Sequence, residues 1–138
     1  SEEESKSIGT HFLELGTLFQ LQDDVLDLYG NKGRNQVGSD ILEGKPSLLV
    51  LRHLEKHPED RDYVWSILSK PRTETSQEEV ASLIHQFRER GALAAALEDI
   101  RMSKTRLLSP SVLSRYPVLE RILHTLVDRI LKPISFLL

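Results

Sequence analysis

The stretch Phe19-Gln20-Leu21-Gln22-Asp23-Asp24-Val25-Leu26-Asp27 decides the fold and most of the chemistry to be expected of this chain. At about 100° per residue, Gln20, Asp23, Asp24 and Asp27 fall within one narrow stripe of an α-helix. Apolar residues fill most of the remaining circumference, namely Phe12, Leu15, Leu18, Phe19, Val25, Leu26, Leu28 and Tyr29. A helix that is apolar over most of its surface is typical of a buried helix. We therefore expect a long buried helix with one charged stripe.

The charged stripe is expected to face a cavity, because several unpaired carboxylates in a dry core would be very costly. Hard divalent cations suit such a cluster, since Mg²⁺ takes oxygen ligands and typically bridges one or two carboxylates to substrate phosphates. The competing interpretation is a solvated helix face, which is what most short Asp-Asp-x-x-Asp strings are. The apolar flanks and the glycine-rich segment 30–45 that follows favour the metal site.

Helical patterns cover most of the chain and strand signals are weak, so we predict an all-α fold, a helical bundle. Gly30 is a typical helix-ending residue, and Ser76 with Glu79 has the form of a capping box. Residues 31–45 are predicted to form a loop. The predicted helices run over about 5–29, 46–56, 58–70, 77–91, 92–108 and 117–132.

Composition excludes several classes of function. The chain has 138 residues and a net charge of −3, so it is one domain or part of one, and it lacks the basic stripe of a nucleic-acid binder. It has no cysteine, which excludes disulfides and thiolate metal sites and fits the cytoplasm. The five histidines show no zinc spacing, and surface or packing roles are expected for them. No apolar run approaches the length of a membrane span, and the acidic start does not resemble a secretory signal.

Several short motifs in order carry a resemblance to a known family. They are Leu15-Gly16, Phe19-Gln20, Asp23-Asp24-x-x-Asp27, Gly30, Gly38-x-Asp40 and Gly44-Lys45. Together they resemble the second aspartate-rich region of the trans-type isoprenyl diphosphate synthases, or polyprenyl synthetases. Arg90-Gly91-Ala92-Leu93 and the small-residue helix after it resemble the C-terminal region of those enzymes. The resemblance covers nearly all of residues 1–138, and only the C-terminal half of the family's catalytic domain.

The resemblance implies the all-helical isoprenoid synthase fold and a prenyltransferase of isoprenoid biosynthesis. In such enzymes an allylic diphosphate loses its diphosphate, the double bond of isopentenyl diphosphate attacks the resulting cation, and a proton leaves. Mg²⁺ and cationic side chains around the diphosphate stabilise the charge that develops on the leaving group. The substrates implied are therefore an allylic diphosphate and isopentenyl diphosphate, with Mg²⁺ as the cofactor.

The motif match assigns roles to the acidic stripe. Asp23 is the expected metal ligand, with Asp27 next. Asp24 would ligate through water or orient the other ligands. Gln20 lies one helical turn earlier and would hold a metal-bound water or a substrate; the alternative is a buried amide bonded to a neighbouring helix.

The glycine-rich loop is expected to supply cationic groups for the diphosphate. Lys45 matches a loop lysine of the family and can reach a phosphate, with a solvated lysine as the alternative. Asp40 is a partner for the loop's basic groups or an acid that orients the ligands, the alternative being a turn residue bonded to backbone. Where the family usually has Gly-Lys, this chain has Asn35-Gln36, so Arg34 or Lys32 would have to substitute.

The family's first aspartate-rich motif, the arginines after it and its central Lys-Thr pair are not in this sequence. We therefore expect the chain alone to lack prenyl transfer, and we expect a fragment, a processed chain or an engineered piece. Its exposed faces would pair with the N-terminal half or with a second copy, as a dimer or other homo-oligomer. The alternatives are a non-catalytic helical partner subunit of a full-length synthase, and a terpene cyclase, whose second motif normally mixes Asn, Ser or Thr with Glu.

Overall fold

The computed structural model describes residues 1–30 and 38–138, and these residues form helices, turns and irregular segments with no strand among them. The predicted all-α fold is confirmed. The α-helices are α1 (Glu2–Tyr29), α2 (Ser39–Leu42), α3 (Leu48–Lys56), α4 (Arg61–Leu68), α5 (Gln77–Glu89), α6 (Ala92–Leu108) and α7 (Pro117–Leu131). Short 3₁₀ segments are η1 (Pro58–Asp60), η2 (Arg72–Glu74), η3 (Val112–Arg115) and η4 (Lys132–Leu137).

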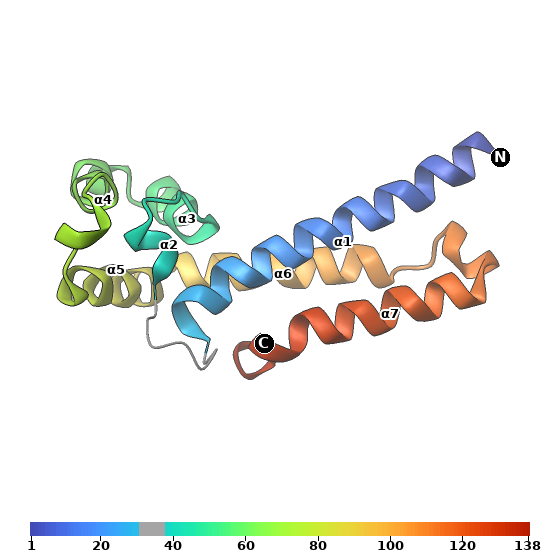
Figure 1. Cartoon of the computed structure of the whole chain (residues 1–138). Helices are drawn as coiled ribbons and strands as arrows, with labels where there is room; N and C mark the ends of the chain where they lie inside the picture. The colour runs from blue at the N-terminus through green and yellow to red at the C-terminus, as the bar shows by residue number, and fades with distance from the viewer. Residues whose placement is uncertain (31–37) are drawn as a thin grey trace.

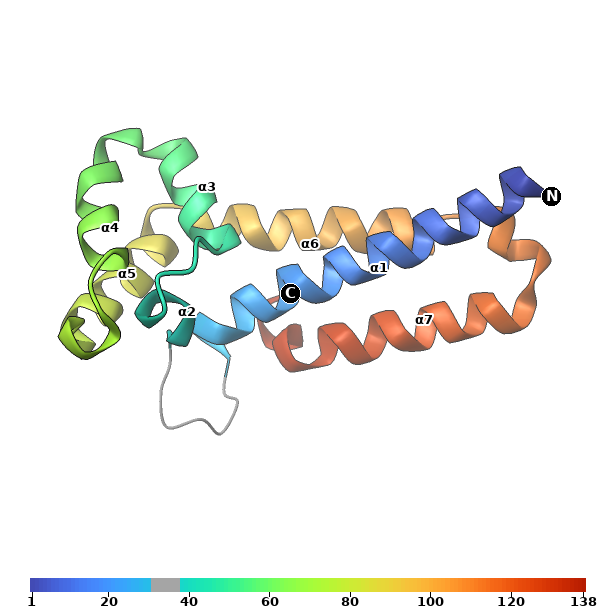
Figure 2. The same cartoon turned by 45° about the horizontal axis from the view of Figure 1, so that its top comes forward.

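Three long helices, α1, α6 and α7, lie side by side, and each contacts the other two (Figures 1 and 2). The shorter helices α2 to α5 gather at one end, where α1 ends and α6 begins (Figure 1). The C-terminal segment η4 returns from the end of α7 and contacts α1. This arrangement brings the last two turns of α1 against α2 and the start of α3.

The core is formed by the sides of the helices that face one another. Leu18 and Val25 of α1, Ile100 of α6 and Val127 of α7 are all fully buried. One polar contact fixes how α1 lies along α6: the hydroxyl of buried Ser103 donates to Glu14 Oε1 at 2.8 Å. Along the described residues, no helix is long and apolar enough to cross a membrane.

Several helix boundaries follow the predicted signals. The structure contains the predicted capping box, in which the Glu79 N–H donates to Ser76 Oγ at 3.1 Å and the Ser76 N–H donates to Glu79 Oε1 at 3.1 Å. The bounds of α6, 92–108, are those predicted, because Gly91 precedes this helix and a Ser-Pro pair follows it. α3 begins at Leu48 rather than at residue 46.

Two further predicted boundaries are wrong. α1 begins at Glu2, three residues earlier than predicted, because the Ser1 side chain accepts the Glu4 N–H at 3.2 Å and caps the first turn. The region predicted as a loop over 31–45 contains the short helix α2. Four residues are too few to show a helical period, so this element left no pattern to read.

The expectation that α1 is buried around most of its circumference is also wrong. Leu13 is 76% exposed, Phe19 is 55% exposed and Phe12 is 38% exposed, and the small residues between them are exposed too. The other long helices pack against only one side of α1, the side that carries Leu15 and Leu18. The middle of α1, over residues 12–19, therefore presents an apolar face to solvent.

Candidate functional site

The acidic stripe lies where α1, α2 and α3 meet. Asp23, Asp24 and Asp27 occupy the last two turns of α1, and Gln20 lies one turn earlier. Asp24 and Asp27 are buried, Asp23 is half-buried, and Gln20 is exposed. The alternative of a fully solvated acidic face does not fit these burials. The structure therefore brings the predicted acidic residues together and encloses two of them with neighbouring backbone.

Asp27 holds the start of α2. The Ser39 hydroxyl donates to Asp27 Oδ1 at 2.6 Å, and the Asp40 backbone N–H donates to Asp27 Oδ2 at 3.1 Å. The backbone carbonyl of Asp27 also accepts the N–H of Gly38 at 3.1 Å. Gly38 has φ +82°, a left-handed conformation that glycine adopts without strain. Three hydrogen bonds thus connect the end of α1 to the first residues of α2.

Asp24 makes the equivalent connection to α3. The backbone N–H of Leu48 donates to Asp24 Oδ2 at 2.9 Å, and the side-chain amide of Gln20 donates to Asp24 Oδ1 at 3.1 Å. The Gln20 amide is therefore bonded to its own helix, not to a neighbouring one. A carboxylate at this position complements the partial positive charge at the N-terminus of α3.

Asp40 and Lys45 lie on the same side of this junction. Lys45 Nζ is 3.8 Å from Asp40 Oδ1, and the lysine side chain is 65% exposed. Burial and the nearby negative charge of Asp27 raise the pKa of Asp40, with smaller contributions from Asp24 and Asp23 and an opposing one from Lys45. The contributions of Asp27, Asp24 and Asp23 to the pKa of Asp40 reflect a negative potential at the junction, which a bound cation would weaken.

Lys32 and Arg34, the proposed substitutes for the family's loop lysine, lie outside the described residues. The same holds for Asn35-Gln36, the pair that departs from the family pattern. Of the predicted cationic groups, Lys45 alone can therefore be placed.

The carboxylates fit Mg²⁺ in chemistry, though not as a complete protein cage. Among the residues the structure describes, no three His, Asp or Glu side chains converge on a point that could hold a metal ion. Mg²⁺ does not need such a cage, because it is commonly bound through one or two carboxylates together with waters and substrate phosphates. A carboxylate has about four lone-pair positions, so the hydrogen bonds to Asp27 do not by themselves exclude a metal ion. Asp23 and Asp27 thus fit a substrate-bridged ion.

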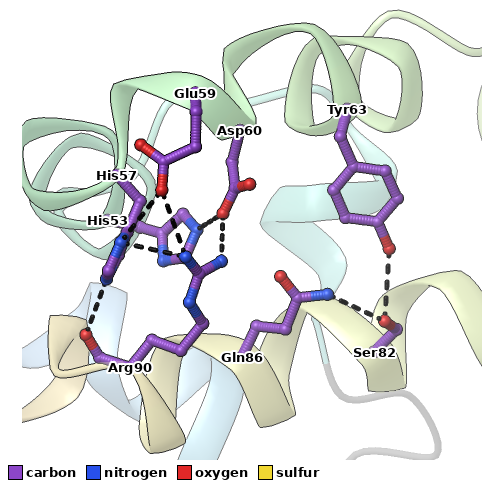
Figure 3. A network of polar contacts seen from close by, with 8 residues as sticks. All are labelled: His53, His57, Glu59, Asp60, Tyr63, Ser82, Gln86 and Arg90. Atoms are coloured by element: carbon purple, nitrogen blue, oxygen red, sulfur yellow. Dashed lines mark hydrogen bonds and ion pairs between the residues drawn. The ribbon is translucent and has the colours of Figure 1, made fainter.

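A second polar cluster, which the sequence did not reveal, connects α3, η1 and the end of α5 (Figure 3). His53 is fully buried and donates from Nε2 to Asp60 Oδ2 at 2.8 Å. The guanidinium of Arg90 bonds to Asp60 and to His57 Nδ1, and His57 Nε2 donates to the Arg90 carbonyl at 3.1 Å. Hydrogen bonding by His53, and then by Arg90, holds the pKa of Asp60 below its usual range. A packing role for His53 is confirmed by its contact with Phe87.

A third polar region, a hollow of about 230 Å³, lies between α1, α3 and α6. It is lined by Leu21, Leu48, Arg52, Asp99, Met102 and Arg106. Arg52 is bonded to Asp99 at 2.7 Å, and Arg106 is bonded to Glu14 at 2.7 Å. Because both guanidinium groups already have carboxylate partners, the acidic junction remains the better candidate for a diphosphate and its metal ion.

Comparison with known proteins supports the resemblance. The sequence model of the family described as Polyprenyl synthetase matches residues 1–87, more than half of the chain. The Short chain isoprenyl diphosphate synthase of Methanothermobacter thermautotrophicus is 39% identical over 100 residues, which cover 67% of this chain and 30% of that protein. The Farnesyl pyrophosphate synthase of Gallus gallus is 41% identical over 63 residues, covering 44% of this chain and 17% of that protein.

A solved structure of geranylgeranyl pyrophosphate synthase superimposes with a TM-score of 0.69 over 93% of this chain and 42% of that chain. At 24% identity this likeness shows the fold alone. The matches thus span less than a third of these two curated relatives and less than half of the solved structure.

Proposed function

The chain belongs to the polyprenyl synthetase family, and from that premise we propose that it forms the C-terminal part of a prenyltransferase site. The reaction proposed is the condensation of isopentenyl diphosphate with an allylic diphosphate, with release of diphosphate. The observation that carries the proposal is the junction of α1, α2 and α3, where Asp23, Asp27 and Lys45 lie together.

Asp23 and Asp27 are the proposed Mg²⁺ ligands. A bound Mg²⁺ would supply positive charge to the departing diphosphate. The chain's own contribution is to hold the two carboxylates on one face of a rigid helix, one turn apart. The hydrogen bonds from Ser39 and from the Asp40 N–H fix the orientation of the Asp27 carboxylate. Such fixed orientation is what a metal ligand requires from the groups around it.

Lys45 is the proposed diphosphate contact among the described residues. Its ammonium group is exposed and lies beside Asp40. Lysine binds phosphate as a point charge, so it does not need the fixed geometry of a guanidinium. Lys32 and Arg34 remain proposed additional contacts.

We further propose that this chain needs other parts of the synthase fold for turnover. The matches cover less than a third of the curated relatives described above, and the exposed apolar face of α1 is a surface on which further helices could pack. The proposed partner is the N-terminal half of a synthase or a second copy of this chain.

The test is a product assay with labelled isopentenyl diphosphate, an allylic diphosphate and Mg²⁺. The chain alone is expected to give no elongated product, and efficient turnover by it would contradict the need for a partner. Mixed with the N-terminal part of the Methanothermobacter thermautotrophicus relative, it is expected to restore turnover.

In that mixture, Asp23→Ala is expected to lower the rate by roughly tenfold or more, as loss of a metal-site group does. Asp62→Ala is the matched control, because Asp62 is exposed on α4, away from the junction. If Asp23→Ala leaves the rate of the mixture unchanged, the chain acts as a non-catalytic partner subunit instead.

A further inference from the structure

We propose that Asp24 is a positioning residue: its carboxylate caps α3 and thereby holds the turn that carries Lys45. The proposal deepens the proposed function and relies on it only for the diphosphate bound by Lys45. The cap itself rests on contacts within the chain. Asp24 thus has a role different from that of Asp23 and Asp27, the proposed metal ligands.

The first observation is that α3 lacks a cap of its own. Ser47 occupies the N-cap position, yet its side chain makes no capping hydrogen bond. The donor at the first position of the helix, the Leu48 N–H, instead reaches Asp24 Oδ2 on α1 at 2.9 Å. The first turn of a helix has backbone donors without partners inside the helix, and Asp24 satisfies one of them, the N–H of the first helical residue.

The second observation concerns the other oxygen of Asp24. Oδ1 accepts the Gln20 amide at 3.1 Å, and Asp24 as a whole residue is only 9% exposed. Both oxygens therefore have protein donors, and neighbouring backbone covers the group. Asp24 therefore acts as a hydrogen-bond acceptor that holds neighbouring parts of the chain in place.

The third observation is that the residues before α3 are tied at both ends. The Lys45 N–H donates to the Asp40 carbonyl of α2 at 2.8 Å, and the Ser47 N–H donates to the Lys45 carbonyl at 2.9 Å. Asp27 is hydrogen-bonded to α2 and Asp24 is hydrogen-bonded to α3. The segment 45–47 therefore connects two helices that are both bonded to α1. Loss of the Asp24 contact frees the α3 end of this segment.

Two substitutions separate positioning from metal binding. Asp24→Asn removes the charge but keeps an oxygen for the Leu48 N–H, and Gln20 can rotate its amide to accept from the new NH₂. Asn caps helices as well as Asp does. Asp24→Ala removes the cap altogether. A metal ligand would lose its charge or its oxygen in the two variants and bind the ion more weakly in both, whereas a cap is lost only in the second.

The first measurement is amide hydrogen exchange in the 138-residue chain. Asp24→Ala is expected to speed exchange at Leu48 and Ser47 by about fivefold or more, the equivalent of losing a side-chain cap of about 1 kcal/mol. Asp24→Asn is expected to leave it near the wild-type rate. The Glu79 N–H, capped by Ser76 on α5, is the internal control. Unchanged exchange at Leu48 in Asp24→Ala would overturn the proposal.

The second measurement is calorimetric titration with Mn²⁺ and inorganic diphosphate. Affinity is expected to fall in Asp24→Ala, to survive in Asp24→Asn, and to be lost in Asp23→Asn. In a Lys45→Gln background, Asp24→Ala is expected to have little further effect, because both changes remove the same contact. A merely structural role for Asp24 would give additive effects instead.

The outcomes of the titration are distinguishable from failure of the proposed function. If Asp24→Asn loses affinity as Asp23→Asn does, Asp24 is a metal ligand and the positioning role is overturned, while the proposed function stands. If the wild-type chain binds no Mn²⁺ and diphosphate, the proposed function fails for this chain, and the exchange rates at Ser47 and Leu48 still decide whether Asp24 holds the turn.

Discussion

At the scale of single residues, Ser39 has the clearest energetic role. Its hydroxyl donates at 2.6 Å to the carboxylate of Asp27, a residue that is only 6% exposed. A hydrogen bond to a charged group contributes about 1.5–3 kcal/mol, and a buried charge that loses a donor keeps its desolvation cost. Ser39 is not part of a distinctive motif, so it was not identified from the sequence. Its position directly after Gly38 is the one signal that could have pointed to it.

We expect Ser39→Ala to lower the free energy of unfolding by about 1.5–3 kcal/mol. Urea denaturation followed by circular dichroism measures this, with Ser69→Ala, an exposed serine at the end of α4, as the matched control. Equal midpoints for the two variants would mean that the Ser39 hydroxyl does not stabilise Asp27.

Asp60 gives the chain a predictable response to acid. The pKa of Asp60 in the folded chain is below its usual value in an unfolded chain. Between these two pKa values the unfolded chain binds more protons than the folded chain, so the free energy of unfolding rises with pH. The contribution is present above about pH 4, the ordinary Asp pKa, and is lost as the pH falls through the lowered value.

Asp60→Asn is therefore expected to flatten the dependence of unfolding free energy on pH below about pH 4. The measurement is a series of urea unfolding curves from neutral pH downward. Asp62→Asn, a change at an exposed carboxylate two residues later, is the control. A slope for Asp60→Asn as steep as that of the control would show that the His53 and Arg90 contacts do not hold Asp60 ionised.

At the scale of elements, α2 is the helix whose geometry is most restricted. Gly38 precedes it with φ +82°, and a Cβ at this position would lie 2.5 Å from Val80 Cγ1 of α5. Gly16, in the middle of α1, would meet no heavy atom within 4 Å. The two glycines therefore predict opposite effects of the same substitution.

We expect Gly38→Ala to destabilise the chain by about 2 kcal/mol or more, because a left-handed conformation alone costs about 1–2 kcal/mol for a residue with a Cβ. Gly16→Ala is expected to stabilise it by about 0.5–1 kcal/mol, because alanine is the better helix former. Chemical denaturation of both variants measures the pair, and effects of the same sign would contradict the structure.

An element could be predicted from the sequence when the residues that fix its ends lie next to it in the chain. The bounds of α6 and the capping box of α5 were predictable because glycine, proline and cap residues lie next to the helices that they end or begin. α2 was not, because it is held by Asp27, which lies twelve residues before Ser39 in the sequence. The cluster of His53, Asp60 and Arg90 was not predictable either, because its residues come from three elements and show no regular spacing in the sequence.

For the candidate site, the spacing of Asp23, Asp24 and Asp27 predicted that the three carboxylates lie together. It did not predict that Asp24 and Asp27 accept backbone N–H groups from two other helices.

At the scale of the whole molecule, the exposed face of α1 is the feature that sequence reasoning judged wrongly. Burial depends on what packs against a helix, and the apolar pattern of α1 predicts only that something should. Leu13 and Phe19 are 76% and 55% exposed on this face. A face of this kind on an isolated chain marks an interaction site or a tendency to associate.

We therefore expect the purified chain to self-associate, and we expect the double variant Leu13→Lys, Phe19→Lys to be monomeric. Analytical ultracentrifugation over a range of concentrations tests this, with Val118→Lys, an exposed apolar residue on α7, as the control. A monomeric wild-type chain at all concentrations would show that the face is tolerated in water.

The pairing of α1 with α6 also bears on how the chain is made. The last residue of α1 is Tyr29 and the first of α6 is Ala92, so the two surfaces that bury each other are separated by more than sixty residues. At ribosomal rates of about 5–20 residues per second, the growing chain carries α1 without its main packing partner for roughly 3 to 13 s. During that interval the side of α1 that packs on α6 is uncovered, so we expect chaperones to bind the nascent chain before it folds.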